Sequence, residues 1–166
     1  PATVHDAEGI ATAHIRSWQA AYAHLLPAEF LSSLSIEQRA QRWTNILQAE
    51  ESNTLVADLK GTVKAFISFG HCRDEAAPSG RAEIWALYAA PDAWGQGLGR
   101  ALIERATGSL RERAFHETSQ WVLSGNTRGV RFYSAAGFEL VSGSQKLFTL
   151  GGVQLEEVQL LLQHAA

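Results

Sequence analysis

The sequence predicts a mixed α/β domain built on a single sheet with crossover helices. Three observations predict this class. In the N-terminal third, apolar residues recur at three- and four-residue steps, which is the period of a helix. The middle of the chain changes to the alternation of a strand. Beyond it, helical and extended patterns alternate to the end of the chain.

Helices are expected before the first strand. The segment Asp6–Ala23 carries apolar residues on one helical face. A short helix is expected through Phe30 and Leu34. Ser35 is the expected N-cap of a further helix, because Gln38 stands at capping-box spacing from it.

Three strands are expected next. Thr54–Ala57 is a short strand, and Thr62–His71 is its longer hairpin partner after the turn Asp58–Gly61. Arg81–Ala89 is largely apolar on both alternating faces, which is typical of a central strand. Alternation places Ile84, Ala86 and Tyr88 on one face, and Trp85, Leu87 and Ala89 on the other, which they share with Glu83.

The C-terminal half begins with a glycine-rich turn and a long helix marked by apolar residues from Leu98 to Leu110. A short strand, a second helix and three strand segments are expected after it. They span Gln120–Leu123, Thr127–Ala136, Phe138–Val141, Lys146–Leu150 and Val153–Leu162. Asn126 and Gly137 are the expected N-cap and left-handed C-cap of the second helix.

Composition narrows the function. The 166 residues fit one domain, 1–166, of which 46% are hydrophobic and 19% charged. A net charge of −3 without a long run of Lys or Arg argues against a nucleic-acid partner. No apolar run approaches the roughly 20 residues that span a bilayer, so no membrane partner is expected. The histidines and the lone Cys72 form no metal motif, and no disulfide can form within the chain, which favours a cytoplasmic protein without a metal.

The most informative stretch is the glycine-rich turn from Trp94 to Ala101, where Gly95, Gly97 and Gly99 alternate before a helix. Glycine permits close approach of a ligand, and the N–H groups at a helix start favour an anion such as a pyrophosphate. The turn lacks the Gly-Lys-Ser/Thr end of a Walker loop and the third-glycine spacing of a Rossmann fingerprint. A tight turn without a ligand stays an alternative at this point.

These residues resemble the GCN5-related N-acetyltransferase (GNAT) family. Its pyrophosphate motif, Gln/Arg-x-x-Gly-x-Gly/Ala, is matched by the segment 94–99 except that Trp94 replaces Gln or Arg. Asn126, followed by the segment Phe132–Phe138 with its Phe-Tyr and Gly-Phe pairs, resembles the second motif of the family. The segments Ile15–Trp18 and Ala20–Tyr22 resemble one common branch, so the resemblance covers nearly the whole chain.

The resemblance implies a splayed central sheet flanked by helices, with acetyl-CoA wedged between the fourth and fifth strands of the family fold. The pantetheine arm would follow the end of the fourth strand, and the pyrophosphate would rest on the glycine turn. Asn126 would contact the pantetheine region, and Tyr133 would lie near the sulfur. The cofactor-binding residues implied are Leu87, Tyr88, Ala89, Gln96, Gly97, Leu98, Gly99, Arg100, Asn126 and Tyr133.

Acetyl transfer to an amine needs a neutral amine and a proton for the leaving thiolate. Tyr133 suits the acid, and Glu83 is the candidate general base, directly or through water. The structural alternatives are that Tyr133 only packs, that Asn126 only caps its helix, and that Glu83 pairs with Arg81 or is solvated.

We therefore expect an N-acetyltransferase that acts on a primary amine of a small molecule or protein by direct attack in a ternary complex. A non-catalytic acyl-CoA binding or sensing domain is the alternative, and a dinucleotide-dependent oxidoreductase is disfavoured by the failed fingerprints. A homodimer is expected through Val153–Leu162, an apolar strand that would otherwise be an exposed edge.

Overall fold

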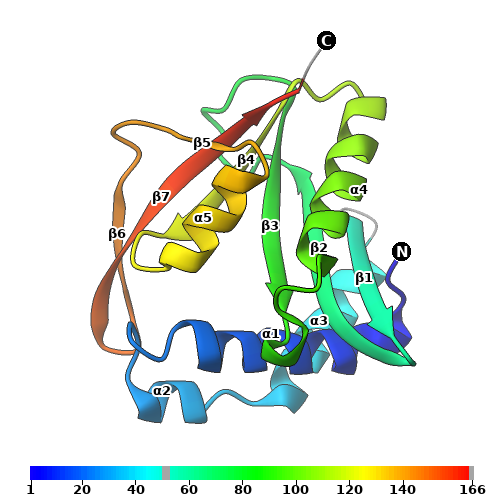
Figure 1. The fold of residues 1–166 in the computed structure, drawn as a ribbon, viewed down its shortest axis with the longest axis vertical. Coiled ribbons are helices and arrows are strands. Elements are labelled where there is room, and N and C mark those ends of the chain that lie inside the picture. Colours follow the sequence, from blue (N-terminus) through cyan, green and yellow to red (C-terminus); the bar gives the residue numbers. More distant parts are fainter. Residues whose placement is uncertain (50–52, 165–166) are drawn as a thin grey trace.

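The computed structural model describes residues 1–49 and 53–164. It confirms the mixed α/β class: seven strands form one sheet in the order β1-β2-β3-β4-β7-β5, and β6 pairs with β7 (Figure 1). The strands are β1 (Asn53–Leu59), β2 (Thr62–His71), β3 (Arg81–Ala89), β4 (Glu117–Leu123), β5 (Glu139–Leu140), β6 (Lys146–Leu150) and β7 (Val153–Gln163). The helices are α1 (Ala7–Ala21), α2 (Ala28–Ser32), α3 (Ile36–Gln48), α4 (Leu98–Glu112) and α5 (Thr127–Ala135).

Most boundaries agree with the sequence expectations, and the hydrogen bonds at the caps explain why. The Ser35 hydroxyl accepts from the Gln38 N–H at 3.2 Å at the start of α3. The Asn126 side chain accepts from the Gly129 N–H at 3.0 Å at the start of α5, and Gly137 has the expected positive φ of 92°. β4 begins three residues before the expected start at Gln120, because parallel pairing with β3 starts at Glu117.

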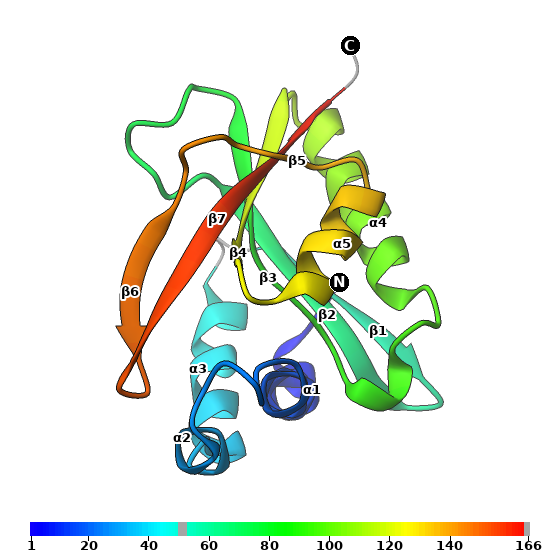
Figure 2. The same cartoon turned by 60° about the vertical axis from the view of Figure 1, so that its left-hand side comes forward.

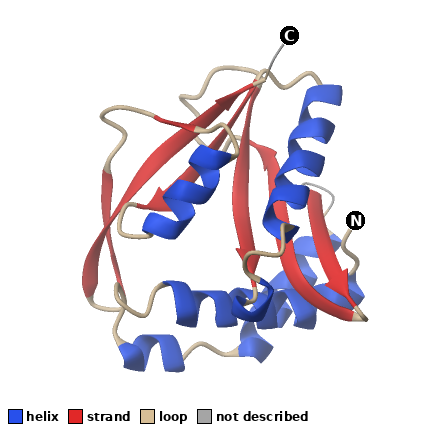
Figure 3. Cartoon of the chain, viewed as in Figure 1, coloured by secondary structure: helices blue, strands red, loops and turns tan. Residues whose placement is uncertain are grey.

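Helices cover both faces of the sheet (Figures 2 and 3). On one face, α4 packs on β2 and β3 over a core that contains Ile67, Ile84 and Leu102. On the other face, α1 and α3 enclose a second core around Phe66 and Trp43. Alternate residues of β2 therefore serve opposite cores, as the period of a strand requires. Among the described residues, no helix is long and apolar enough to span a bilayer.

The sheet is split at the boundary between β3 and β4. These parallel strands pair only from Arg81 with Glu117 to Ile84 with Gln120. Beyond that point β3 continues to Ala89 on its other partner, β2, and β4 continues to Leu123 on β7. From Trp85 onward, the backbone edge of β3 that faces β4 therefore has no strand partner among the described residues.

A β-bulge at Trp85 accompanies the split. The β2 register passes from Ser68 opposite Ala86 to Phe69 opposite Ile84, which leaves Trp85 as the extra residue. The bulge corrects the faces expected from simple alternation: Ile84 and Leu87 share the α4 core, whereas Ala86 packs on the α1 and α3 core.

The C-terminal strands correct the dimer expectation. β7 is an internal strand, because it pairs with β4 on one side and with β5 and β6 on the other. Val153–Leu162 is thus not an exposed edge, and the reason for expecting a dimer there is removed. The short strand β5 and the hairpin strand β6 cover it instead.

His14 is a buried neutral base in the core between α1 and α3. Its Nδ1 accepts a hydrogen bond from Trp43 Nε1 at 3.3 Å, and its ring stacks on Tyr88. Burial, with a contribution from Arg39, lowers the pKa of His14 from 6.5 to about 3. As the pH falls, His14 is protonated at a higher pH in the unfolded chain than in the folded protein. Acid should therefore favour unfolding.

This linkage gives the first prediction. As the pH falls from about 7.5 to about 5, protonation of His14 in the unfolded chain should lower the free energy of unfolding by about 2 kcal/mol. A His14→Gln variant should not show this decrease. Urea unfolding of both proteins across this pH range measures the difference. Parallel pH profiles of the two proteins would contradict a buried neutral His14.

The bulge gives the second prediction, through the contact of Gly70 with Trp85. A Cβ at Gly70 would lie 2.5 Å from the Trp85 ring, whose Nε1 donates to the His71 carbonyl at 3.2 Å. Gly70→Ala should therefore lower the free energy of unfolding by about 1–3 kcal/mol. In the control, Gly108→Ala within α4, the new Cβ meets no neighbouring atom, and stability should rise by about 0.5–1 kcal/mol. Equal effects in the two variants would show that Trp85 does not occupy this space.

Candidate functional site

A cavity of about 630 Å³ lies at the split of the sheet, and we call it the main cavity. Its walls come from both sides of the split: Leu87, Tyr88 and Ala89 on β3, and the segment Gln120–Leu123 on β4. The glycine turn and the first turn of α4 line it at one end, and residues of α1, β6 and β7 line it elsewhere. Elements that are distant in sequence thus meet around one space.

The glycine turn presents unpaired backbone donors to this cavity. Gly97 is the N-cap of α4 with a φ of 79°, and no side chain caps the helix. The first intrahelical bond is donated by Ala101 to Gly97, so the N–H groups of Leu98, Gly99 and Arg100 have no partner within the helix. A Cβ on Gly97 would have no atom within 4 Å. Since Gly97, Leu98, Gly99 and Arg100 line the cavity, the turn suits an anionic group.

Polar contacts fix the turn to the rest of the fold. Trp94 Nε1 donates to the Ala89 carbonyl at 2.8 Å, which attaches the turn to the end of β3. Just before it, the Asp92 carboxylate accepts from Lys64 of β2 at 2.6 Å. This hydrogen bond holds the pKa of Asp92 below its usual value, and Arg16 of α1 lies 3.8 Å from the same carboxylate. The turn is therefore positioned by three neighbouring elements.

Trp94, the departure from the family motif, has a cationic partner. The Arg128 guanidinium, from the first turn of α5, lies 4.1 Å from the centroid of the Trp94 ring. Both residues line the main cavity, together with Arg100 and Arg131. The Trp94–Arg128 pair thus brings a cation to the edge of the glycine turn, although position 94 itself carries no charge or amide.

Tyr133 lies inside the same cavity. It is 5% exposed, and its ring packs edge-on against Phe132 and Phe138. Among the described residues its hydroxyl has no hydrogen-bond partner. Burial, with a contribution from Tyr88, raises the pKa of Tyr133 well above its usual value. The phenol therefore keeps its proton and can donate a hydrogen bond within the cavity.

Asn126 is a helix cap and also lines the cavity. Its side-chain oxygen accepts from Gly129, so capping explains its position at the start of α5. The same side chain lies beside Tyr22, the residue after α1, and acts to lower the pKa of its phenol. Asn126 therefore links the α5 side of the split to the α1 side.

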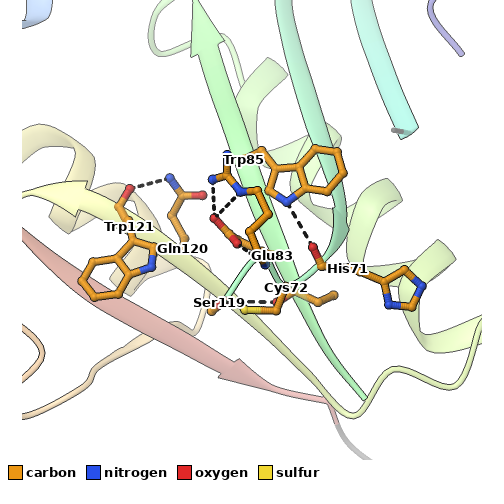
Figure 4. A network of polar contacts seen from close by, with 9 residues as sticks. His71, Cys72, Glu83, Trp85, Ser119, Gln120 and Trp121 are labelled. Atoms are coloured by element: carbon orange, nitrogen blue, oxygen red, sulfur yellow. Dashed lines mark hydrogen bonds and ion pairs between the residues drawn. The ribbon is translucent and has the colours of Figure 1, made fainter. Parts of the chain in front are cut away.

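Two sequence-predicted site residues lie apart from the others. The Gln96 side chain is exposed and donates to the Asp92 carbonyl at 2.9 Å, outside the lining of the cavity. Glu83 is 3% exposed and also lies outside that lining. Its carboxylate accepts from the Arg73 N–H at 2.9 Å and forms an ion pair with the Arg73 guanidinium (Figure 4). Its partner is thus not Arg81, which pairs with Glu117 instead.

Sequence reasoning missed several polar residues of the cavity, among them Glu157 on β7 and Gln120 on β4. The buried Oε1 atom of Gln120 has no hydrogen-bond partner within the described part of the chain, while Nε2 donates to the Trp121 carbonyl at 2.7 Å (Figure 4). Neither residue is marked out in the sequence, because β4 and β7 each carry several other polar residues. In the part of the chain that the structure describes, no group of three or more His, Cys, Asp or Glu residues could hold a metal ion.

Comparison with known proteins agrees with this geometry. Residues 15–138 match the acetyltransferase (GNAT) family. The chain is 31% identical to the N-acetyltransferase YuaI of Bacillus subtilis over 159 residues, which are 96% of this chain and 88% of that protein.

Solved structures share the fold. The PaiA N-acetyltransferase of Thermoplasma acidophilum, in complex with coenzyme A, has a TM-score of 0.75 at 20% identity and covers 98% of this chain and 96% of its own. The acetyltransferase YncA of Salmonella typhimurium, with acetyl-CoA, has a TM-score of 0.74 at 23% identity. The match covers 99% of this chain and 94% of that protein. The chain therefore belongs to the GNAT family of N-acetyltransferases, enzymes that take the acetyl group from acetyl-CoA.

Proposed function

We propose that this enzyme transfers the acetyl group from acetyl-CoA to a primary amine by direct attack in a ternary complex. One observation carries the proposal: an uncapped glycine turn, an unpaired strand edge and a buried phenol all open on the same cavity. The first two features suit a phosphate and an amide-containing arm, and the third suits a leaving thiolate.

In this proposal the pyrophosphate of acetyl-CoA accepts hydrogen bonds from the N–H groups of Leu98, Gly99 and Arg100. The pantetheine arm lies along Leu87, Tyr88 and Ala89, whose backbone edge can pair with its amides as a strand would. Asn126 bounds the arm on the α5 side. Arg128, held on Trp94, supplies the cation that the family motif would place at position 94.

Tyr133 is the proposed acid. It would give its proton to the thiolate when the carbon–sulfur bond breaks, because it lines the cavity that the thiolate would occupy. Glu83 stays a predicted base that would act through water, because its carboxylate is held by Arg73 outside the main cavity. An acyl-CoA sensor would need the turn and the strand edge, but not a protonated phenol beside them.

Cofactor binding gives the third prediction. Gly97→Leu should weaken binding of coenzyme A at least about tenfold, because the new side chain enters the cavity next to the phosphate donors. Gly61→Leu is the matched control, since Gly61 has a φ of 78° against 79° for Gly97 and both have open space at Cβ. Each variant should lose about 1–2 kcal/mol of stability from the strained φ. Calorimetry with coenzyme A distinguishes them, and equal affinities would contradict the placement of the phosphates.

The acid role of Tyr133 gives the fourth prediction. Tyr133→Phe keeps the ring contacts with Phe132 and Phe138, so coenzyme A affinity should not change. The kcat should fall about a hundredfold, since a positioned acid contributes at least that much. Steady-state thiol release with an accepted primary amine measures this. An unchanged kcat would reduce Tyr133 to a packing residue.

A further inference from the structure

The end of the main cavity opposite the glycine turn has a distinct chemistry. Its walls are aromatic and apolar, and they come from α1, β4 and the β6–β7 hairpin. We call this region the aromatic end, and it comprises Trp18, Tyr22, Trp121, Phe148, Leu150 and Glu157. Among the residues that the structure describes, Glu157 is the only acidic one that lines the cavity, whereas the lining cations Arg100, Arg128 and Arg131 belong to α4 and α5. Charge in the cavity is thus separated along its length.

The Glu157 carboxylate is available to a ligand. It is half-buried, and among the described residues it has no ion pair or hydrogen bond. The neighbouring cations are engaged elsewhere: Lys146 lies 3.9 Å over the Trp121 ring, and Arg73 is paired with Glu83. Across the sheet, Glu157 stands opposite Leu123 of β4 and Lys146 of β6.

Its surroundings favour a base. Burial raises the pKa of Glu157, and the charged groups that act on it are Lys146 of β6, Glu83 of β3 and Arg73 of the loop between β2 and β3. Lys146 and Arg73 lower that pKa, whereas Glu83 raises it further. Trp121 and Leu123 of β4, on the other side, do not titrate. A carboxylate with a raised pKa in a substrate cavity is suited to proton abstraction.

We propose that Glu157 binds the acceptor ammonium and removes its proton, and that the aromatic end selects a small primary amine with an apolar, uncharged body. This inference rests on the proposed function. The single carboxylate matches one ammonium group. A carboxylate on the acceptor would be repelled by Glu157, and a second ammonium would find no second carboxylate among the described lining residues.

Two protons leave the ammonium nitrogen during the transfer. Glu157 takes one proton from the ammonium, and the neutral nitrogen attacks the thioester carbonyl and forms the C–N bond. As the tetrahedral intermediate collapses, the C–S bond breaks and Tyr133 protonates the thiolate. The nitrogen gives its second proton back to Tyr133, through water, and Glu157 releases the first to solvent. The products are the amide, coenzyme A and one proton.

Acceptor selection is tested with 2-phenylethylamine, L-phenylalanine and spermidine as probes. The first two differ only by a carboxylate, and spermidine adds further cations. We expect kcat/KM for 2-phenylethylamine to exceed the other two at least about tenfold. A preference for either of the others overturns the inference. If coenzyme A binds in calorimetry but 2-phenylethylamine is neither bound nor acetylated, this inference fails and the proposed function stands. Failure of coenzyme A itself to bind would overturn the proposed function.

The base is tested with Glu157→Gln, Glu157→Asp and Glu156→Gln. Glu156 is the exposed neighbour on the opposite face of β7, so its variant should behave as wild type. Glu157→Gln should lower kcat/KM about a hundredfold, remove the acidic limb of its pH profile and raise the KM of the amine, with coenzyme A affinity unchanged. Glu157→Asp should recover the acidic limb. An acidic limb that persists in Glu157→Gln but disappears in Glu83→Gln would overturn the proposal in favour of Glu83.

Discussion

The parallel pairing of β3 with β4 stops at Ile84 and Gln120, and the whole site depends on this stop. Each strand keeps its other partner beyond that point, so the sheet opens without losing its strands. The bulge at Trp85 sets the face on which the rest of β3 presents its side chains. Beyond this point a cavity lies between β3 and β4, and the backbone edge of β3 is free to pair with a ligand.

The opening passes between the two layers of helices, and the cavity therefore has two ends of different chemistry. On the α4 and α5 side, helix N–H groups and arginines provide positive charge where phosphates would bind. On the α1 and hairpin side, aromatic rings surround a single carboxylate. Tyr133, Tyr88 and Asn126 lie along the walls between these ends. The fold thus gives a direction to the transfer from a phosphate-bearing donor to an amine.

The sequence predicts the elements well because period and caps are local properties. The glycine turn was recognisable for the same reason, since its spacing lies within eight residues. The prediction from simple alternation failed at Trp85. Both faces of β3 are apolar, so an inserted residue does not change the visible pattern of apolar residues. The prediction that Val153–Leu162 is an edge strand was wrong, because the sequence of one strand does not determine which strands pair with it. Arg73 as the partner of Glu83, and Glu157 as a lining residue, depend on loop conformation and sheet register in the same way.

The central claim is that the unpaired edge of β3 and the start of α4 together hold the cofactor. Hydrogen–deuterium exchange with and without coenzyme A tests it most directly. The account predicts slower exchange at the amides of β3 from Leu87 to Ala89 and of α4 from Leu98 to Arg100, with β1 unchanged. Saturating coenzyme A that leaves both segments unprotected, or that protects only segments away from the main cavity, would contradict it.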